Sequence, residues 1–358
     1  MSDLAGNPYA SIVELSKAYR NKSVSPSEVT KAQLARIDIL DAKLGSYQTI
    51  YGDEALAAAR AADKAYTEDA RLGPFHGIPF ALKDIYELKG QITTYGSYEM
   101  RQRISIETGT VVRRLLEVGG IAIGKTKTVE CALGGWGTNE HMGTPWNPWD
   151  LEHPRVPGGS SSGSGVAVAS GLASCATGSD TGGSVRLPAA YCGLTGLKVS
   201  KACLPTDGIM PLSQTLDTPG PMTRNMADLA LMFSIMKGID GRKIETDMMN
   251  GNGLFNIQMN IFKGLKFGII DQKERSNCTD DILKSYDETL NLLVDLGAEL
   301  EVFTSPVAYD DMAQFNGAIT MYEGYRNHRH LYDDPSKGVD QNVKRRMLVG
   351  RDLSLIHI

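Results

Sequence analysis

The sequence predicts an α/β fold in which a sheet is flanked by helices, and two observations support this prediction. Segments typical of strands alternate along the chain with segments typical of helices, the order expected when helices pack on the faces of a sheet. The 358 residues are 42% hydrophobic and 22% charged, as in ordinary globular proteins, and a chain of this length buries roughly three-quarters of its unfolded surface. Length alone allows two domains, and we expect one.

The N-terminal part of the chain reads as a helical scaffold. Residues 11–21 carry apolar residues at roughly helical spacing. Residues 25–28 (Ser-Pro-Ser-Glu) predict the start of a long helix, because the serine and glutamate can form a capping box and the proline suits the first turn. Asp53 is expected to cap a further, alanine-rich helix.

The next elements are a buried strand, an amphipathic helix and a second strand. Pro79–Leu82 is an apolar run that ends on Lys83, and by pattern alone such a lysine reaches out to water. Gly109–Val118 predicts the helix, and Ile121–Ile123 predicts the second strand.

Residues 119–126 (GGIAIGKT) satisfy the P-loop pattern G-x-x-x-x-G-K-[ST]. A true P-loop follows a strand and opens a helix. This segment instead follows a helix and places a strand between its glycines. We therefore expect no nucleotide site at Lys125.

The stretch Pro157–Ser200 holds two serine clusters, each beside paired glycines. Between them, Gly163–Gly171 reads as a helix of small residues and Ser174–Ser179 as a short strand. Glycine allows the backbone to turn and to approach a ligand closely. Thr181–Ser184 therefore predicts a turn lined with N–H donors and ending in a hydroxyl.

These residues resemble the signature of the amidase signature family of serine amidohydrolases. The matching segments are Gly158–Ser161, Asp180–Ala190, Gly196–Lys198 and, upstream, GIP-x-x-x-KD at 77–84. The resemblance covers roughly residues 8–353, with its core at 73–224, and Ser162 is a small departure where many members have glycine. It implies a mixed, twisted central sheet with helices on both faces.

The resemblance also implies site roles. Ser184 would be the nucleophile, and Lys83 the base, acting through Ser160, which in the family follows a cis peptide bond. The backbone N–H groups of Thr181, Gly182, Gly183 and Ser184 would form the oxyanion hole. Ser161, Asp180 and Arg186 would support this network, although Asp180 and Arg186 could also be an ordinary surface ion pair. No histidine, metal or cofactor is required.

A lysine base must lose its proton easily. Its ordinary pKa of ~10.4 would have to fall to about 7–8 to serve near neutral pH. Burial disfavours the charged form, and we expect the neighbouring Phe80 and Leu82 to supply that burial for Lys83.

The implied function is an amidase that hydrolyses a carboxylic or urea-like amide to an acid and ammonia or an amine. An alternative is the glutaminase subunit of a tRNA-dependent amidotransferase complex. Those subunits tend to carry an Asn- and Arg-rich stretch where this chain has Met321–His328, which favours a free-standing amidase. An inactive, amidase-like binding protein is less favoured, because Lys83, Ser160 and Ser184 are all present.

The residues alone also allow another hydrolase. Gly159–Gly163 satisfies G-x-S-x-G, the nucleophile elbow of α/β-hydrolases, with Ser161 as nucleophile. That elbow needs a strand directly before it, and Glu152–Pro157 is a poor strand with two prolines.

Composition and charge limit the classes of molecule that we expect the protein to bind. The net charge is −5 without a Lys/Arg-rich run, so we expect a small-molecule amide and no direct nucleic-acid contact. No apolar run approaches membrane length and residues 1–20 lack a signal pattern, so we expect a cytoplasmic protein without a membrane partner. Five cysteines without C-x-x-C spacing indicate reduced thiols. His328 and His330, the one suggestive histidine pair, are expected to be exposed rather than metal ligands, and a homodimer is possible.

The C-terminal third predicts strand, helix, strand over Lys266–Asp271, Asp280–Leu296 and Glu299–Phe303, after an irregular segment at 245–263. Family members usually continue well beyond this point. We therefore expect a single amidase domain over residues 1–353 that lacks the family's C-terminal part, with 354–358 as a non-native tail.

Overall fold

The computed structural model describes residues 6–68, 72–239 and 261–357. The chain divides into two compact units, residues 1–245 with 316–358, and residues 246–315. Each unit is described by itself. The single domain expected for residues 1–353 remains a prediction.

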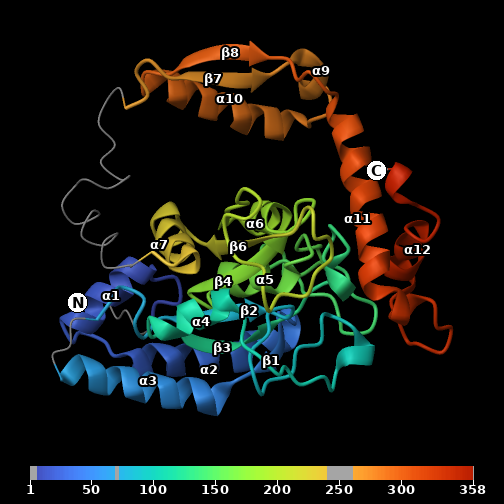
Figure 1. Cartoon of the computed structure of the whole chain (residues 1–358). Helices are drawn as coiled ribbons and strands as arrows, with labels where there is room; N and C mark the ends of the chain where they lie inside the picture. The colour runs from blue at the N-terminus through green and yellow to red at the C-terminus, as the bar shows by residue number, and fades with distance from the viewer. Residues whose placement is uncertain (1–5, 69–71, 240–260, 358) are drawn as a thin grey trace. The chain divides into compact units, whose positions relative to one another are not determined.

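The first unit is built on a six-stranded mixed sheet (Figure 1). Its strands are β1 (Tyr47–Ile50), β2 (Pro79–Lys83), β3 (Ile121–Thr126), β4 (Cys175–Asp180), β5 (Thr195–Gly196) and β6 (Thr218–Thr223), in the order β1-β3-β2-β4-β6-β5. β2 lies between β3 and β4 and is parallel to both, whereas β1, β6 and β5 pair antiparallel to their neighbours. The predicted α/β fold with a mixed sheet is confirmed.

Helices cover both faces of this sheet. They are α1 (Ile12–Arg20), α2 (Pro26–Leu44), α3 (Gly52–Thr67), α4 (Thr110–Glu117), α5 (Ser162–Ala169), α6 (Arg186–Cys192) and α7 (Met226–Lys237). The long helix α11 (Tyr309–Tyr332) contributes residues to both units. Helix α12 (Gln341–Val349) lies beside α11 and not on the sheet (Figure 1). None of the described helices is both long and apolar enough to cross a membrane.

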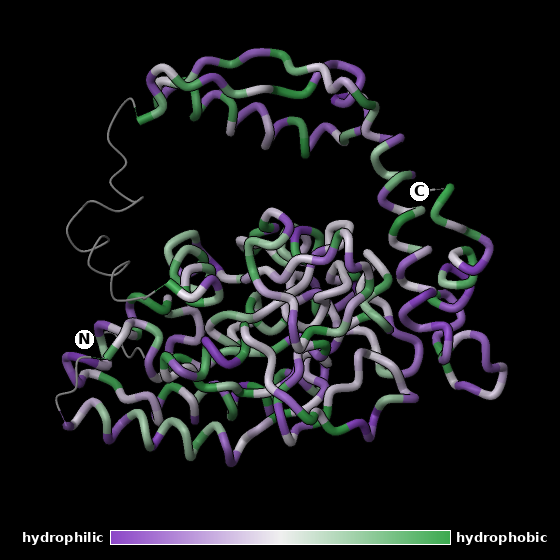
Figure 2. Tube along the Cα trace, in the orientation of Figure 1, coloured by the Kyte–Doolittle hydropathy of each residue, from purple (hydrophilic) through white to green (hydrophobic). Residues whose placement is uncertain are grey.

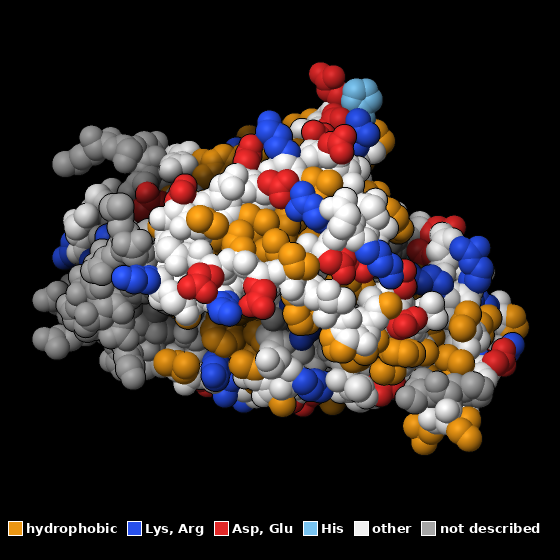
Figure 3. All heavy atoms as spheres, turned by 90° about the horizontal axis from the view of Figure 1, so that it is seen from above, with side chains coloured by type: hydrophobic (Ala, Val, Ile, Leu, Met, Phe, Trp, Pro, Cys, Tyr) orange, Lys and Arg blue, Asp and Glu red, His pale blue; other side chains and the backbone are white. Residues whose placement is uncertain are grey.

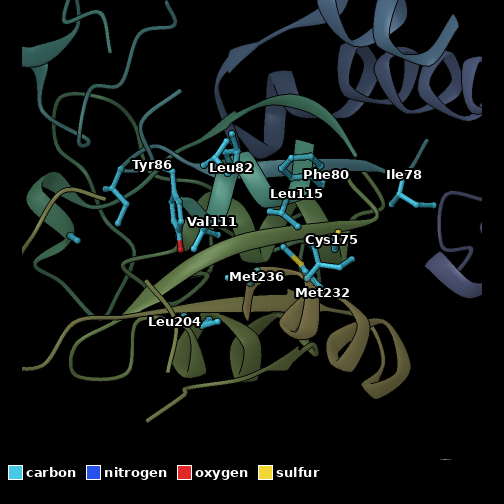
Figure 4. Packing of buried hydrophobic residues seen from close by; sticks show 14 of the residues in the cluster. Ile78, Phe80, Leu82, Tyr86, Val111, Leu115, Cys175, Leu204, Met232 and Met236 are labelled. Carbon is cyan, nitrogen blue, oxygen red and sulfur yellow. The ribbon is translucent and has the colours of Figure 1, made fainter. Parts of the chain in front are cut away.

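Alternation along β2 separates the two faces of the sheet. Phe80 and Leu82 pack in the larger core cluster together with Leu115 of α4 and Met232 of α7 (Figure 4). Ala81 packs in the other cluster, with residues of α2 and α5. Because side chains alternate along a strand, Lys83 shares the face of Ala81, toward α5.

Side-chain hydrogen bonds between neighbouring residues mark the starts of helices α1 and α2. The predicted capping box of Ser25 and Glu28 is present at the start of α2, and Ser11 and Glu14 form another at α1. The expectation for Asp53 was wrong: Tyr51 is the N-cap residue of α3, without a side-chain hydrogen bond. Asp53 lies in the first turn instead, where a carboxylate is favoured by the helix dipole. Hydrophilic and hydrophobic residues alternate along α3, as expected for a helix on the surface of a core (Figure 2).

Helix α5 is composed of small residues because it is almost entirely buried. A Cβ atom at Gly163 would lie 2.2 Å from the carbonyl oxygen of Ser46, and one at Gly165 would lie 3.1 Å from Pro188. Larger side chains would push α5 away from the segment before β1 and from α6. The small-residue pattern seen in the sequence is thus a packing requirement.

Strand β6 was not predicted, because Pro219 and Pro221 lack the N–H donor that a central strand uses. Along an antiparallel strand, alternate residues direct their backbone groups to opposite neighbours. The carbonyl of Pro221 accepts from Leu197, so the two prolines face the side of β5, a strand of only 2 residues. The residues of β6 whose backbone groups face β4 are not prolines, so they keep their N–H donors.

The described part of the second unit is a strand-helix-strand unit, as predicted. β7 (Lys266–Ile270) and β8 (Glu299–Phe303) pair in parallel, and α9 (Gln272–Arg275) and α10 (Asp280–Asp295) connect them. Most of the segment predicted to be irregular, 245–263, lies outside the described residues.

Charges of both signs are mixed on the face seen in Figure 3, where no large area carries only Lys and Arg side chains. All five cysteines are free thiols, and Cys131, Cys175 and Cys192 are buried. The expectation of reduced thiols therefore matches the structure.

Candidate active site

Lys83 is the last residue of β2, at the carboxyl edge that β2 shares with β4. Its side chain is completely buried. The ammonium Nζ lies 2.8 Å from Ser160 Oγ and 2.7 Å from Ser179 Oγ, and it donates to both. The Lys83 N–H donates to Thr177 Oγ1 at 3.0 Å. The lysine is therefore held by two hydroxyls and not by a carboxylate.

Burial lowers the pKa of Lys83 to about 7, while the more distant charges of Asp217 and Asp180 act to raise it. At this pKa, the amine is in good part neutral near pH 7. The source of the burial differs from our expectation, because Phe80 and Leu82 point to the opposite face of the sheet. The face that Lys83 shares with Ala81 is closed by α5 instead.

Ser160 and Ser161 lie directly before α5, and the Gly159–Ser160 peptide bond is cis. The carbonyl of Ser160 accepts from Thr128 Oγ1 at 2.9 Å. Ser161 Oγ accepts from the N–H of Ser179 at 3.2 Å, and its own N–H donates to the carbonyl of Ser184 at 3.3 Å. Ser161 thus ties the backbones of Ser179 and Ser184 together. Residues 151–161 form no strand, so the nucleophile elbow of an α/β-hydrolase is absent at Ser161.

The turn Thr181–Ser184 follows β4 directly. Gly183 has φ +127°, a conformation open to glycine, and its N–H donates to Asp180 Oδ1 at 2.8 Å. Because the N–H of Gly183 is occupied by Asp180, the N–H groups of Thr181, Gly182 and Ser184 are the ones that remain of the four donors expected for an oxyanion. Within the described residues, the N–H groups of Thr181, Gly182 and Ser184 donate to no protein acceptor.

Asp180 and Arg186 pair within this turn. Arg186 Nη2 lies 2.8 Å from Asp180 Oδ1, and Nε lies 3.0 Å from Oδ2. Burial would raise the pKa of Asp180, but the hydrogen bonds and charge of Arg186 keep it below its usual value. The Asp180 side chain is 0% exposed and also accepts from the N–H of Val185. The pair is therefore not an ordinary surface ion pair.

Three further residues contact this site that the sequence did not single out. Ser179 is the second partner of Lys83, and the two-residue alternation of the predicted strand could have placed it on the same face as Thr177. Asp217 Oδ1 accepts from Thr181 Oγ1 at 2.5 Å. Asn316 Nδ2 donates to the carbonyl of Thr181 at 3.0 Å. Asp217 opens a segment, 217–224, that resembles the family, whereas Asn316 carries no local signal.

A cavity of about 110 Å³ adjoins the turn, with Ser179, Thr181 and Asp217 in its wall. Ala132, Lys201 and residues between 206 and 219 complete it. A larger cavity of about 500 Å³ lies beside α2 and Trp149, and no residue of the turn lies in its wall. The walls of both cavities lack Lys83, Ser160 and Ser184. Of these two cavities, the smaller one is the candidate substrate pocket, because Ser179 and Thr181 lie in its wall.

The other motifs have structural explanations. The strand expected between the glycines of the P-loop pattern is β3, and Lys125 is completely buried, where its Nζ donates to the Tyr86 carbonyl and to Thr93 Oγ1 at 2.6 Å each. His328 was expected to be exposed and is buried, with Nε2 2.8 Å from the carbonyl oxygen of Pro211. In the part of the chain that the structure describes, no three His, Cys, Asp or Glu side chains gather as metal ligands would.

Comparison with known proteins gives a consistent answer. The family described as Amidase matches residues 28–352. The A subunit of the glutamyl-tRNA(Gln) amidotransferase of Geobacter metallireducens is 35% identical over 361 residues, which cover 95% of this chain and 73% of the relative. The corresponding protein of Acinetobacter baylyi is 35% identical over 362 residues, with the same coverage.

Solved structures resemble the chain over nearly its whole length. The peptide amidase from Stenotrophomonas maltophilia superposes with a TM-score of 0.77 at 28% identity, covering 96% of this chain and 75% of the amidase. A structure described as a vestigial protein complex, which bears on the origins of an s-triazine catabolic enzyme, superposes with a TM-score of 0.85 at 26% identity, covering 97% and 75%.

Proposed function

Because the chain belongs to the amidase family, the amidase signature enzymes, we propose that it hydrolyses a linear amide through an acyl-enzyme on Ser184. The observation that carries the proposal is the pairing of a buried Lys83, with its lowered pKa, to Ser160. An inactive binding protein would have no need of such a lysine, because burying an amine without a counter-ion costs stability.

In the proposed reaction, the hydroxyl of Ser184 attacks the amide carbon and gives its proton to Ser160, which passes its own proton to the lone pair of neutral Lys83. The amide oxygen becomes an oxyanion and accepts hydrogen bonds from free N–H groups of the turn, with Gly182 and Ser184 the leading candidates. The proton held by Lys83 returns through Ser160 to the leaving nitrogen, which departs as ammonia or an amine. Water then cleaves the acyl-enzyme by the same proton path, which releases the acid and restores Ser184.

The reaction should slow on the acid side of pH 7. Only neutral Lys83 accepts a proton, and its pKa lies at about 7, so protonation below that pH removes the base. We expect the rate at which a fluorophosphonate labels the protein to fall about tenfold for each pH unit below 6. The measurement is the labelling rate between pH 5 and 9. A rate that is the same at pH 5.5 and pH 8 would exclude Lys83 as the base.

The proposed chemistry could serve two kinds of protein, the glutaminase subunit of an amidotransferase complex or a free-standing amidase; we call these the glutaminase setting and the free-standing setting. The curated relatives that match nearly the whole chain at 32–35% identity are named as the A subunit of a glutamyl-tRNA(Gln) amidotransferase. They favour the glutaminase setting over the free-standing amidase that we preferred from residues 321–328. In that setting the substrate is glutamine, and the ammonia passes to another protein of the complex. The homodimer remains a prediction.

One structural observation keeps the free-standing amidase as the second candidate. The stretch Met321–His328, which departs from the pattern of amidotransferase subunits, lies in α11 against the pocket loop. Glu323 accepts from the N–H of Thr215 at 3.0 Å and also from Ser213 Oγ, and Asn327 Nδ2 donates to the carbonyl of Leu212 at 3.1 Å. The departure therefore falls on residues that shape the substrate pocket.

A panel of amides separates the two settings. We expect glutamine to release ammonia at least about tenfold faster than aryl amides or biuret-like compounds, because a pocket built for a polar substrate discriminates against analogues that leave its polar groups unpaired. The measurement is ammonia release at equal substrate concentration, with Ser184→Ala as the blank. Preferred hydrolysis of an aryl or biuret-like amide would instead favour the free-standing amidase.

A further inference from the structure

Helix α11 brings an amide side chain to the turn from a part of the chain far beyond it. Asn316 belongs to the first unit and is half-buried. Its Nδ2 donates to the carbonyl of Thr181 at 3.0 Å. Its Oδ1 lies 2.9 Å from the place where a Cβ atom of Gly182 would stand. Asn316 therefore lies against both residues of a single peptide group.

This peptide group is rigid. The carbonyl of Thr181 and the N–H of Gly182 lie in one plane and point in opposite directions. A hydrogen bond that fixes the carbonyl therefore also fixes the direction of the N–H. Without it, the plane could rotate, because glycine tolerates almost any φ on the far side of the peptide.

The rest of the turn has other supports. Asp180 holds the N–H groups of Gly183 and Val185. Asp217 holds the side chain of Thr181. Within the described residues, the hydrogen bond from Asn316 is the one that reaches the Thr181 carbonyl. No other hydrogen bond within the described residues fixes this carbonyl, so the orientation of the Gly182 N–H depends on Asn316.

We propose that Asn316 is a positioning residue for amide hydrolysis, which aims the N–H of Gly182 at the developing oxyanion. The inference rests on the proposed function. An oxyanion exists only in the transition state and the tetrahedral intermediate, so Asn316 should affect the rate of the chemical step and leave binding unchanged.

The test uses a fluorophosphonate, whose phosphonyl oxygen would occupy the place of the oxyanion. Three variants are compared with the wild type: Asn316→Ala, Asn316→Leu, and Gln314→Ala as the control. Leucine has a similar size to asparagine but donates no hydrogen bond. Gln314 is exposed on the same helix, two residues away. The limiting labelling rate, the probe concentration at half-saturation and the thermal unfolding temperature are measured for each.

We expect the limiting rate to fall about tenfold in both Asn316 variants, with half-saturation changed by less than about twofold, and to stay at the wild-type value in Gln314→Ala. A wild-type limiting rate in a folded Asn316→Leu would overturn the inference. So would a change confined to half-saturation, which would make Asn316 a binding contact. Normal labelling of Ser184→Ala would instead overturn the proposed function, whatever the Asn316 variants do.

Discussion

Replacement of Ser184 by alanine is expected to abolish covalent labelling by a fluorophosphonate, whereas Ser161→Ala should only slow it. Ser184 is the proposed nucleophile, and loss of such a serine costs on the order of 10⁶-fold in rate in a well-studied serine protease. Ser161 instead holds the backbones of Ser179 and Ser184 in place. Its loss should therefore disturb the site without removing the reacting group.

The measurement is the labelling rate combined with peptide mapping of the adduct. Ser162→Ala is a suitable control, since Ser162 belongs to the same serine cluster and its Oγ donates to the carbonyl of Lys127, away from the lysine base. We expect Ser162→Ala to label as the wild type does. An adduct mapped to Ser161 would return the chain to the α/β-hydrolase mechanism and contradict the proposal.

Replacement of Lys83 by methionine is expected to slow labelling by roughly 10²–10⁴-fold, the usual contribution of a general base. Methionine is a flexible, neutral side chain that can fill the buried space left by the lysine. Ser160 would then keep its place but lose the group that takes its proton. The residual labelling should no longer fall on the acid side of pH 7.

A matched control is Lys127→Met, because Lys127 is a partly buried lysine. It lies beside the start of α5, where its backbone carbonyl accepts from the N–H of Gly163. We expect this variant to keep both the wild-type rate and its dependence on pH. If Lys83→Met labels at the wild-type rate while remaining folded, Lys83 is not the base. A rate that is low but keeps its acid-side fall would assign that fall to another group.

Much of the scaffold was predictable because its signals are local. A capping box such as Ser25 with Glu28 involves residues three positions apart, so the neighbouring sequence is enough to place the start of a helix. The α/β alternation is likewise visible along the chain. The error at Asp53 has the same origin, since several residues near a helix start can serve as the cap and the backbone path selects among them.

The sequence by itself determined the family and the residue types of the site, because the serine clusters and Lys83 lie in segments that resemble the amidase signature. Only the tertiary structure decided what surrounds them. It turned Lys83 toward α5 and away from Phe80 and Leu82, and it occupied the N–H of Gly183 with Asp180.

The tertiary structure also allowed a strand with two prolines at β6 and brought Asn316 to Thr181, 135 positions away in the sequence. Such contacts leave no local pattern, because they depend on how whole elements pack and not on which residues are neighbours in the chain. Short sequence motifs therefore predict the residue types of the candidate site, whereas the packing of the sheet, α5 and α11 sets its geometry.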